Sequence, residues 1–268
     1  MKKIKKYLAL TRAGILDAMQ FRMSLVVMFF GNILYLILIY FLWKSIYASA
    51  GTDVVNGMTF EMTMVYLVLA TALFNFMEMY TVWEVGRKIQ SGEIVLCLLR
   101  PMKYKKFLFW SFTGNMLINF IGTFLPTMII VTVVTKGEVK IGINLLYFAV
   151  AVILGIIINY NIDFIISTVC LFTESIWGIN IMKQVIVAFL SGATIPLAFF
   201  PDKLEKVVNL LPFRAIYDTP LTLLMDDGSD ITAVLSKLGF SLAWTIAISV
   251  ISSLFWNSSI KQVTVNGG

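Results

Sequence analysis

The sequence lacks histidine altogether, and it contains only two cysteines, Cys97 and Cys170. Without histidine, a Ser-His-Asp triad, a Cys-His pair and the usual ligand sets of a zinc site are excluded. Cys97 falls in a loop that we place in the cytoplasm, and no disulfide with Cys170 is expected in that reducing compartment. Much of the enzymatic repertoire is therefore closed to this chain.

Charge is also scarce, because only 13% of the 268 residues are charged while 59% are hydrophobic. A soluble domain is closer to half apolar and a quarter charged. The net charge is +6, and basic residues on the cytoplasmic side of a membrane protein explain it. Nucleic acid is not an expected partner, since no basic stretch belongs to a soluble domain.

What the sequence has instead is long apolar runs of about 20 residues, the length that spans a bilayer. They predict an all-α integral membrane protein with six transmembrane helices in a single domain, residues 1–268. The spans are expected at residues 23–47, 58–82, 107–135, 141–172, 181–198 and 233–256. Short turns are expected at residues 136–138 and, around Glu174, at residues 173–180. Pro126 should kink the third span.

The basic leader, residues 1–22, carries apolar residues at helical spacing, which is typical of a helix in the membrane interface. A cleaved secretory signal is the alternative, because residues 48–50 read Ala-Ser-Ala. The apolar run before them is too long for the core of a signal peptide, however. We therefore expect an interfacial helix.

The distribution of basic residues predicts the orientation. Most of the 21 Lys and Arg residues fall in the leader, in segment 83–106, in the turn between spans four and five, to which we assign Lys183, and in the tail. Basic residues gather on the cytoplasmic side, and six spans place both termini on one side. Both termini are thus expected in the cytoplasm, within the plasma membrane of a bacterium.

Segment 83–106 joins spans two and three and is charged and amphipathic. Four apolar residues are expected to share one face: Val85, Ile89, Leu96 and Leu99. Gly86 and Gly92 weaken a continuous helix, and Pro101 stops it. Such a segment either lies on lipid or docks into the groove of a partner protein.

Segment 199–230 contains three prolines and short apolar pieces, none long enough to span. These pieces indicate re-entrant or interfacial helices on the outer side. In the span before this segment, four small residues allow close helix approach, either within the subunit or at a subunit interface. They are Ser191, Gly192, Ala193 and Thr194.

Two stretches carry recognisable motifs. The first is Ile89-x-x-Gly92-Glu93-Ile94-x-x-x-Leu98-Leu99-Arg100-Pro101. The second contains Ile195-Pro196-Leu197, Phe199-Phe200-Pro201, Leu211-Pro212-Phe213, Tyr217 and Pro220. Together with the basic leader and the order of spans, they resemble ABC-type export permeases with six spans per subunit. That class exports drugs, lipids, polysaccharides and peptides.

The resemblance implies a non-catalytic transport subunit embedded in membrane lipid. Two permease subunits, identical or homologous, would meet around a central path near spans two and five. Each would receive a separate ATPase subunit that holds ATP and Mg²⁺, so no cofactor is expected in this chain. The sequence also contains no G-x-x-x-x-G-K-[ST] phosphate loop, which agrees with an ATPase on another polypeptide.

The resemblance also assigns residues to the coupling helix and to the outer gate. The coupling helix, seated in a cleft of the ATPase, would use Glu84, Arg87, Ile89, Gly92, Glu93, Ile94, Leu98, Leu99, Arg100 and Pro101. The gate formed by the outer re-entrant helices would use Phe199, Phe200, Pro201, Pro212, Phe213, Tyr217 and Pro220.

Polar residues inside the spans have two interpretations. Asn159 and Asp163 lie four residues apart and face one way, and an ionised Asp at a helix centre costs about 2.5–3.5 kcal/mol on insertion scales. They form either a wall of the transport path or hydrogen bonds between helices. The same choice applies to the other polar or bending positions: Asn75, Glu78, Ser191, Gly192, Thr194 and Pro196.

Two other functions remain open at this point. A channel or ion-coupled secondary transporter would use Asp163 as its coupling group, but we see no inverted repeat. An intramembrane hydrolase needs two carboxylates that share a proton, and only Asp163 lies well inside a span. The cargo is not readable from the residues.

Overall fold

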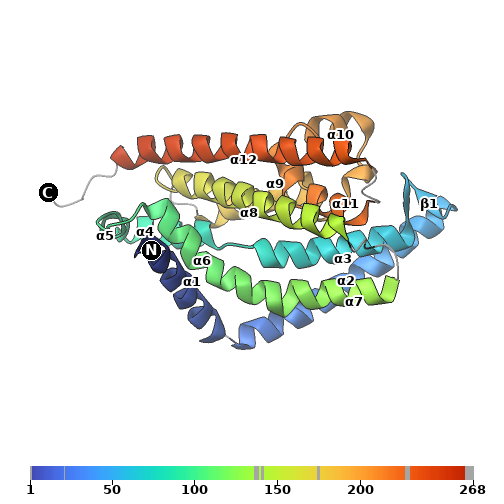
Figure 1. Cartoon of the computed structure of the whole chain (residues 1–268), viewed down its shortest axis with the longest axis horizontal. Helices are drawn as coiled ribbons and strands as arrows, with labels where there is room; N and C mark the ends of the chain where they lie inside the picture. Colours follow the sequence, from blue (N-terminus) through green and yellow to red (C-terminus); the bar gives the residue numbers. More distant parts are fainter. Residues whose placement is uncertain are drawn as a thin grey trace.

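A computed structural model describes residues 2–20, 22–135, 139, 142–173, 176–226 and 230–262. The expected turns at 136–138 and around Glu174 fall largely outside these residues. In the described part, five helical stretches are long and apolar enough to cross a membrane. They are Phe30–Ala50, Phe60–Gln90, Tyr104–Thr135, Ile143–Val169 and Ile231–Ser259. The helices run roughly along one direction (Figure 1), as expected for an all-α membrane protein.

The two ends of this bundle carry different elements (Figure 1). Helices α1 (Lys2–Gln20), α4 (Thr81–Gln90), α5 (Ile94–Leu98) and the C-terminal end of α12 (Ile231–Ser259) lie on the left, which we call the termini end. The opposite, hairpin end carries strands β1 (Val54–Val55) and β2 (Met58–Thr59), with α10 (Asp202–Val208) and α11 (Asp218–Met225) nearby. A 3-10 turn, η4 (Ile260–Gln262), follows α12.

Helix α1 occupies the leader, where an interfacial helix was predicted, and it packs along α6 (Tyr104–Asn119). The two backbones touch where Gly14 crosses Gly114. A Cβ atom on Gly114 would lie 2.3 Å from the carbonyl oxygen of Thr11, and one on Gly14 would lie 2.3 Å from that of Ser111. Only glycine permits such an approach.

Between α2 (Arg22–Ala50) and α3 (Phe60–Met77), the polar stretch forms a small antiparallel hairpin that the sequence interpretation did not anticipate. Asn56 and Gly57 occupy its turn with φ of 49° and 78°, the conformation that an Asn-Gly turn favours. Tyr47 donates a hydrogen bond to the Met58 carbonyl at 2.9 Å, and Thr59 caps α3 through the Met62 amide. The hairpin thus fixes how the first two long helices join.

The second span was expected to run unbroken over residues 58–82, and this is wrong. Helix α3 ends at Met77, and Glu78 follows in an extended conformation with ψ of 121°. The chain turns at Tyr80 before α4 begins at Thr81. The break therefore separates the long membrane helix from the segment that points to the termini end.

The third span was predicted to kink at Pro126, and the structure shows a π-helical turn just before this residue. Helix α6 passes into a π-helical turn, η1 (Phe120–Phe124), and then into α7 (Leu125–Thr135). The Leu125 amide bonds to the Phe120 carbonyl, five residues back. Proline offers no amide hydrogen and clashes with the carbonyl four residues before it, so the wider π turn accommodates the ring within a continuous helix.

The fifth apolar helix is shifted from its expected range of 181–198. Helix α9 runs from Ile176 to Leu190, so it is only 15 residues long. Gly192 adopts a φ of +81° and ends the helix, as glycine commonly does. The residues at 191–194 therefore lie beyond the helix, and the expected helix-packing stripe there is wrong. Helix α9 is shorter than the roughly 20 residues that a membrane span needs.

Helix α9 nevertheless connects the two ends of the bundle. It begins beside α4, since a Cβ atom on Gly86 would lie 2.8 Å from Ile176. Beyond its last turn, the Ser191 carbonyl accepts a hydrogen bond from the Asp218 amide at 3.1 Å. Helix α8 (Ile143–Val169) packs against α4, α11 and α12 and forms the centre of the bundle.

Residues 197–225 form the short helices that the sequence predicts for this region. They are η2 (Leu197–Phe199), α10, η3 (Pro212–Ala215) and α11, and none is longer than 8 residues. They dock closely on α8, where a Cβ atom on Gly155 would lie 3.0 Å from the carbonyl oxygens of Ala215 and Ile216. Tyr217 and Leu221 fill the core beneath them.

Candidate functional site

A buried ion pair joins α8 to α9. The Lys183 ammonium lies 2.8 Å from a carboxylate oxygen of Asp163, and their side chains are 4% and 0% exposed. The sequence interpretation placed Lys183 in a cytoplasmic turn, and this is wrong because Lys183 lies inside α9. Asp163 thus faces protein, where a cation offsets the cost of holding its charge away from water.

The break after Met77 lies against the same ion pair. Asn159 on α8 donates a hydrogen bond to the Met77 carbonyl at 3.3 Å, and Gln184 on α9 donates to Glu78 at 3.4 Å. Lys183 also interacts electrostatically with Glu78. We call Glu78, Asp163 and Lys183 the charge cluster; it ties the break in the second span to two other helices.

A second feature is a cavity of about 270 Å³ between α2, α3 and α9. Asn75 and Thr194, both expected at a path or a packing site, line it together. Sequence reasoning missed three further polar residues on its wall: Asn32, Tyr35 and Thr71. Their signal was a polar side chain within an apolar run, which in a membrane helix usually faces the bundle interior or a water-filled cavity.

The expected coupling residues occupy α4, α5 and the turns around them. Gly92 separates the two helices with φ of +75°, as the weak helix propensity of glycine predicts. Glu84, Arg87 and Lys88 form an ion-pair cluster on α4. Beyond Gly92, Glu93 and Pro101 are exposed.

The prediction that Val85, Ile89, Leu96 and Leu99 share one face is wrong. Val85 is fully buried and Ile89 is partly buried, whereas Leu96 and Leu99 are 66% and 77% exposed. Ile94 also points inward. The reason is the turn at Gly92, which reorients α5 relative to α4. The segment therefore has a buried face, with Val85 and Ile94, that packs against the bundle. It also has an exposed apolar face, formed by Leu96 on α5 and by Leu99 directly after it.

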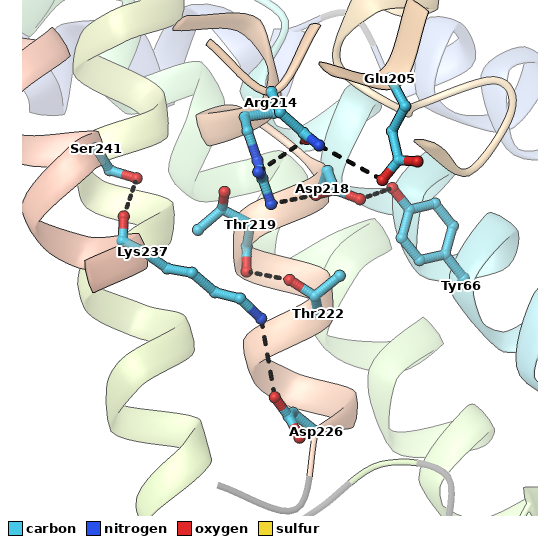
Figure 2. Close-up of polar contacts among 10 residues, drawn as sticks. Tyr66, Glu205, Arg214, Asp218, Thr219, Thr222, Asp226, Lys237 and Ser241 are labelled. Carbon is cyan, nitrogen blue, oxygen red and sulfur yellow. Dashed lines mark hydrogen bonds and ion pairs between the residues drawn. The ribbon is translucent and has the colours of Figure 1, made fainter. Parts of the chain in front are cut away.

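The hairpin end contains a polar network, drawn in Figure 2. Asp218 on α11 accepts hydrogen bonds from Tyr66 on α3 at 3.3 Å and from Arg214 at 3.4 Å. Arg214 also donates to Asn209 at 2.8 Å, and Asn209 donates to Glu205 on α10 at 3.4 Å. Burial raises the pKa of the Asp218 carboxyl, while the charges of Arg214 and Lys237 act in the opposite direction. Asp218 thus links α11 to α3 directly, and Arg214 extends the network to the end of α10.

The residues expected at the outer gate surround this network without forming it. Phe199 stacks edge-on against Trp43 of α2 at 4.6 Å, and Phe200 packs against Phe189 of α9 at 4.9 Å. The remaining five begin or fill the short helices: Pro201, Pro212, Phe213, Tyr217 and Pro220. The polar partners Tyr66, Arg214 and Asp218 were missed, because their meeting depends on tertiary structure.

Comparison with protein families shows to which family the chain belongs. The model of a family described as ABC-2 family transporter protein matches residues 33–267. The chain belongs to the ABC-2 transporter family. No match was found among curated proteins. The family assignment confirms the resemblance that the motifs at 89–101 and 195–220 carry, and it makes the chain an integral membrane permease of the ABC-transporter type.

These features follow one another along α3. Tyr66 of the polar network comes first, Thr71 and Asn75 of the cavity follow, and the charge cluster lies at the break after Met77, before α4. Permeases of this family are membrane transport subunits and are generally not catalytic.

Proposed function

We propose that this ABC-2 permease is the membrane subunit of an ATP-driven exporter for an amphipathic or lipidic cargo in a bacterial plasma membrane. Two separate ATPase subunits power it, and a second permease, identical or homologous, completes the path. The observation that carries the proposal is the outer apolar face of Leu96 and Leu99. Exposed leucines on a short helix rooted by a buried inner face suit insertion into the groove of a partner protein.

The geometry suggests how ATPase movement reaches the path. A pull on α5 is transmitted to α4, whose buried residues Val85 and Gly86 pack against the bundle. The first turn of α4 adjoins the break at Glu78, where the charge cluster contacts α8 and α9. Rigid helices that meet at a break can change angle there, so we assign the hinge to residues 78–80.

The 270 Å³ cavity is the part of the path that this subunit contributes. Its polar lining in otherwise apolar helices supports that assignment. The network around Asp218 forms the gate at the hairpin end, because it holds α3 against α10 and α11. An ion-coupled carrier built on Asp163 is less well supported, since Lys183 already neutralises that carboxylate inside the protein.

The test is capture of the ATPase by the permease from its native host. The wild-type chain should copurify with a protein that hydrolyses ATP and carries a phosphate loop, and Leu99→Asp should reduce the captured amount at least tenfold. A charge in a desolvated apolar contact costs more than the 1.4 kcal/mol that a tenfold loss represents. Ile89→Asp is a poorer probe, because Ile89 packs against the core.

Leu210→Asp is the matched control, since Leu210 is 71% exposed and follows α10 at the hairpin end. It should leave ATPase capture unchanged, as should a conservative Leu99→Met. Deletion of residues 91–99 should abolish capture while the chain still inserts into the membrane. A wild-type chain that transports alone, or equal capture by Leu99→Asp and Leu210→Asp, contradicts the proposal.

A further inference from the structure

A larger cavity, about 730 Å³, lies at the termini end, and two residues expected in the coupling helix, Glu84 and Arg100, line it. Helices α1, α4 and α6 form its walls. Its volume falls in the range of small-molecule sites. Because α6 begins at Tyr104 and the cavity extends along it to Asn115, the cavity starts where the apolar span starts. That is the level at which lipid headgroups lie.

The charges on the cavity wall are only partly paired within the described part of the protein. Glu84 is already engaged by Arg87, at 3.3 Å, and by Lys88. Asp17 on α1 and Arg100 after α5 also line the cavity. Within the part of the chain that the structure describes, neither of these two residues forms an ion pair. The cavity therefore presents one exposed carboxylate and one exposed guanidinium without an ion-pair partner among the described residues.

Arg100 is held at the border between polar and apolar lining. Its guanidinium lies over the ring of Phe107, 4.2 Å from the ring centre, and Phe107 also lines the cavity. A guanidinium stacked on a ring keeps its N–H groups free at the edge, in the fork geometry that matches a phosphate. An anion placed there would contact Arg100 without displacing a protein carboxylate.

Much of the remaining wall is apolar, although Ser111 and Asn115 also line it. Leu10 on α1 and Phe112 on α6 line it beside Phe107. A ligand that fits must therefore carry an anion, a cation and an apolar portion. Phospholipids with a phosphate and a primary ammonium combine all three. A purely anionic headgroup would meet the Asp17 carboxylate without a cation, and a quaternary ammonium has no N–H to donate to it.

We propose that this cavity binds a zwitterionic phospholipid with a primary ammonium headgroup. Its phosphate lies on Arg100, its ammonium on Asp17, and its glycerol and first acyl carbons along Leu10 and Phe112. The bound lipid fills the space between α1 and the coupling segment. This site goes beyond the proposed export function, because binding needs only the permease chain and no ATPase.

The test measures lipid binding to the purified, delipidated full chain in detergent by native mass spectrometry. Short-chain phosphatidylethanolamine, phosphatidylcholine and phosphatidylglycerol are titrated separately. Because Asp17 is exposed, we expect phosphatidylethanolamine to bind at most about fivefold more tightly than the other two, the upper range for an exposed ion pair. Asp17→Asn should remove this preference, and Arg100→Gln should weaken the binding of all three lipids.

Two further variants keep the test decisive. Ala13→Trp places a large ring on the cavity wall and should abolish the tight binding. Asp202→Asn removes an exposed carboxylate of α10 at the other end and should change nothing. Equal affinity of the wild type for the three lipids overturns the proposal, and so does an Asp17→Asn variant that binds as Asp202→Asn does. Because the lipid-binding assay contains no ATPase, a negative result in it does not affect the ATPase-capture test of the proposed function.

Discussion

Lys183→Met is expected to lower the free energy of unfolding by about 3–5 kcal/mol, the usual cost of removing one partner from a buried ion pair. The change keeps the length of the side chain but leaves the Asp163 carboxylate without its ion-pair partner and removes the electrostatic attraction of Lys183 for Glu78. Denaturant titration of the purified chain in detergent, followed by tryptophan fluorescence, measures the effect.

The two members of the buried ion pair, Asp163 and Lys183, should differ in how much their substitution lowers the free energy of unfolding. Asp163→Asn leaves Lys183 with Glu78 as a partner, so its cost should be clearly smaller than that of Lys183→Met. The exposed pair on α4 supplies the control: Lys88→Met, whose side chain and partner are 19% and 31% exposed, should cost no more than about 1 kcal/mol. Equal effects of Lys183→Met and Lys88→Met would show that the charge cluster is not a buried unit.

The second large effect is expected from Gly114→Leu, which should detach α1 from α6. A Cβ atom at this position would lie 2.3–2.6 Å from backbone atoms of Thr11, Gly14 and Ile15. Backbone cannot move aside as a flexible side chain can, so the cost should reach or exceed the upper end of the 1–3 kcal/mol that overpacking typically causes. The Thr11 contact with the Trp110 carbonyl, at 3.3 Å, would be lost as well.

Limited trypsin digestion measures this detachment, because cleavage after Arg12 requires α1 to leave α6 and unwind. The variant should be cut there much faster than the wild type. Gly239→Leu on α12 is the control, since no atom lies within 4 Å of a Cβ at that glycine, and it should behave as the wild type. If Gly114→Leu keeps the wild-type cleavage rate, the glycine crossing does not hold α1.

Features with a local cause were predictable from the sequence. Apolar runs predict the long helices, and Gly92 predicts the division of segment 83–106 into two helices. Each depends on the chain within a few residues. The end of α9 could also have been predicted, because glycine, here Gly192, is a typical residue just beyond a helix end. The apolar residues that follow it made the predicted span too long.

Features that depend on tertiary contacts were not predictable in the same way. The sequence shows Asp163 and Lys183 20 residues apart, and nothing local places both inside the protein. Lys183 instead looked like a cytoplasmic cation, since most basic residues in membrane proteins are. The inner position of Val85 and the outer position of Leu99 likewise depend on how α4 packs against α8 and α9.

The central claim is that α4 and α5 face the cytoplasm, where an ATPase can bind them. Labelling of Arg87→Cys with a membrane-impermeant maleimide tests it directly. Cys97 and Cys170 are buried, whereas the Arg87 side chain is 70% exposed, so the new thiol dominates the signal. The account predicts no labelling in intact cells and strong labelling in inside-out vesicles, with the reverse result for Lys203→Cys at the hairpin end. Labelling of Arg87→Cys in intact cells would place this segment outside and contradict the account.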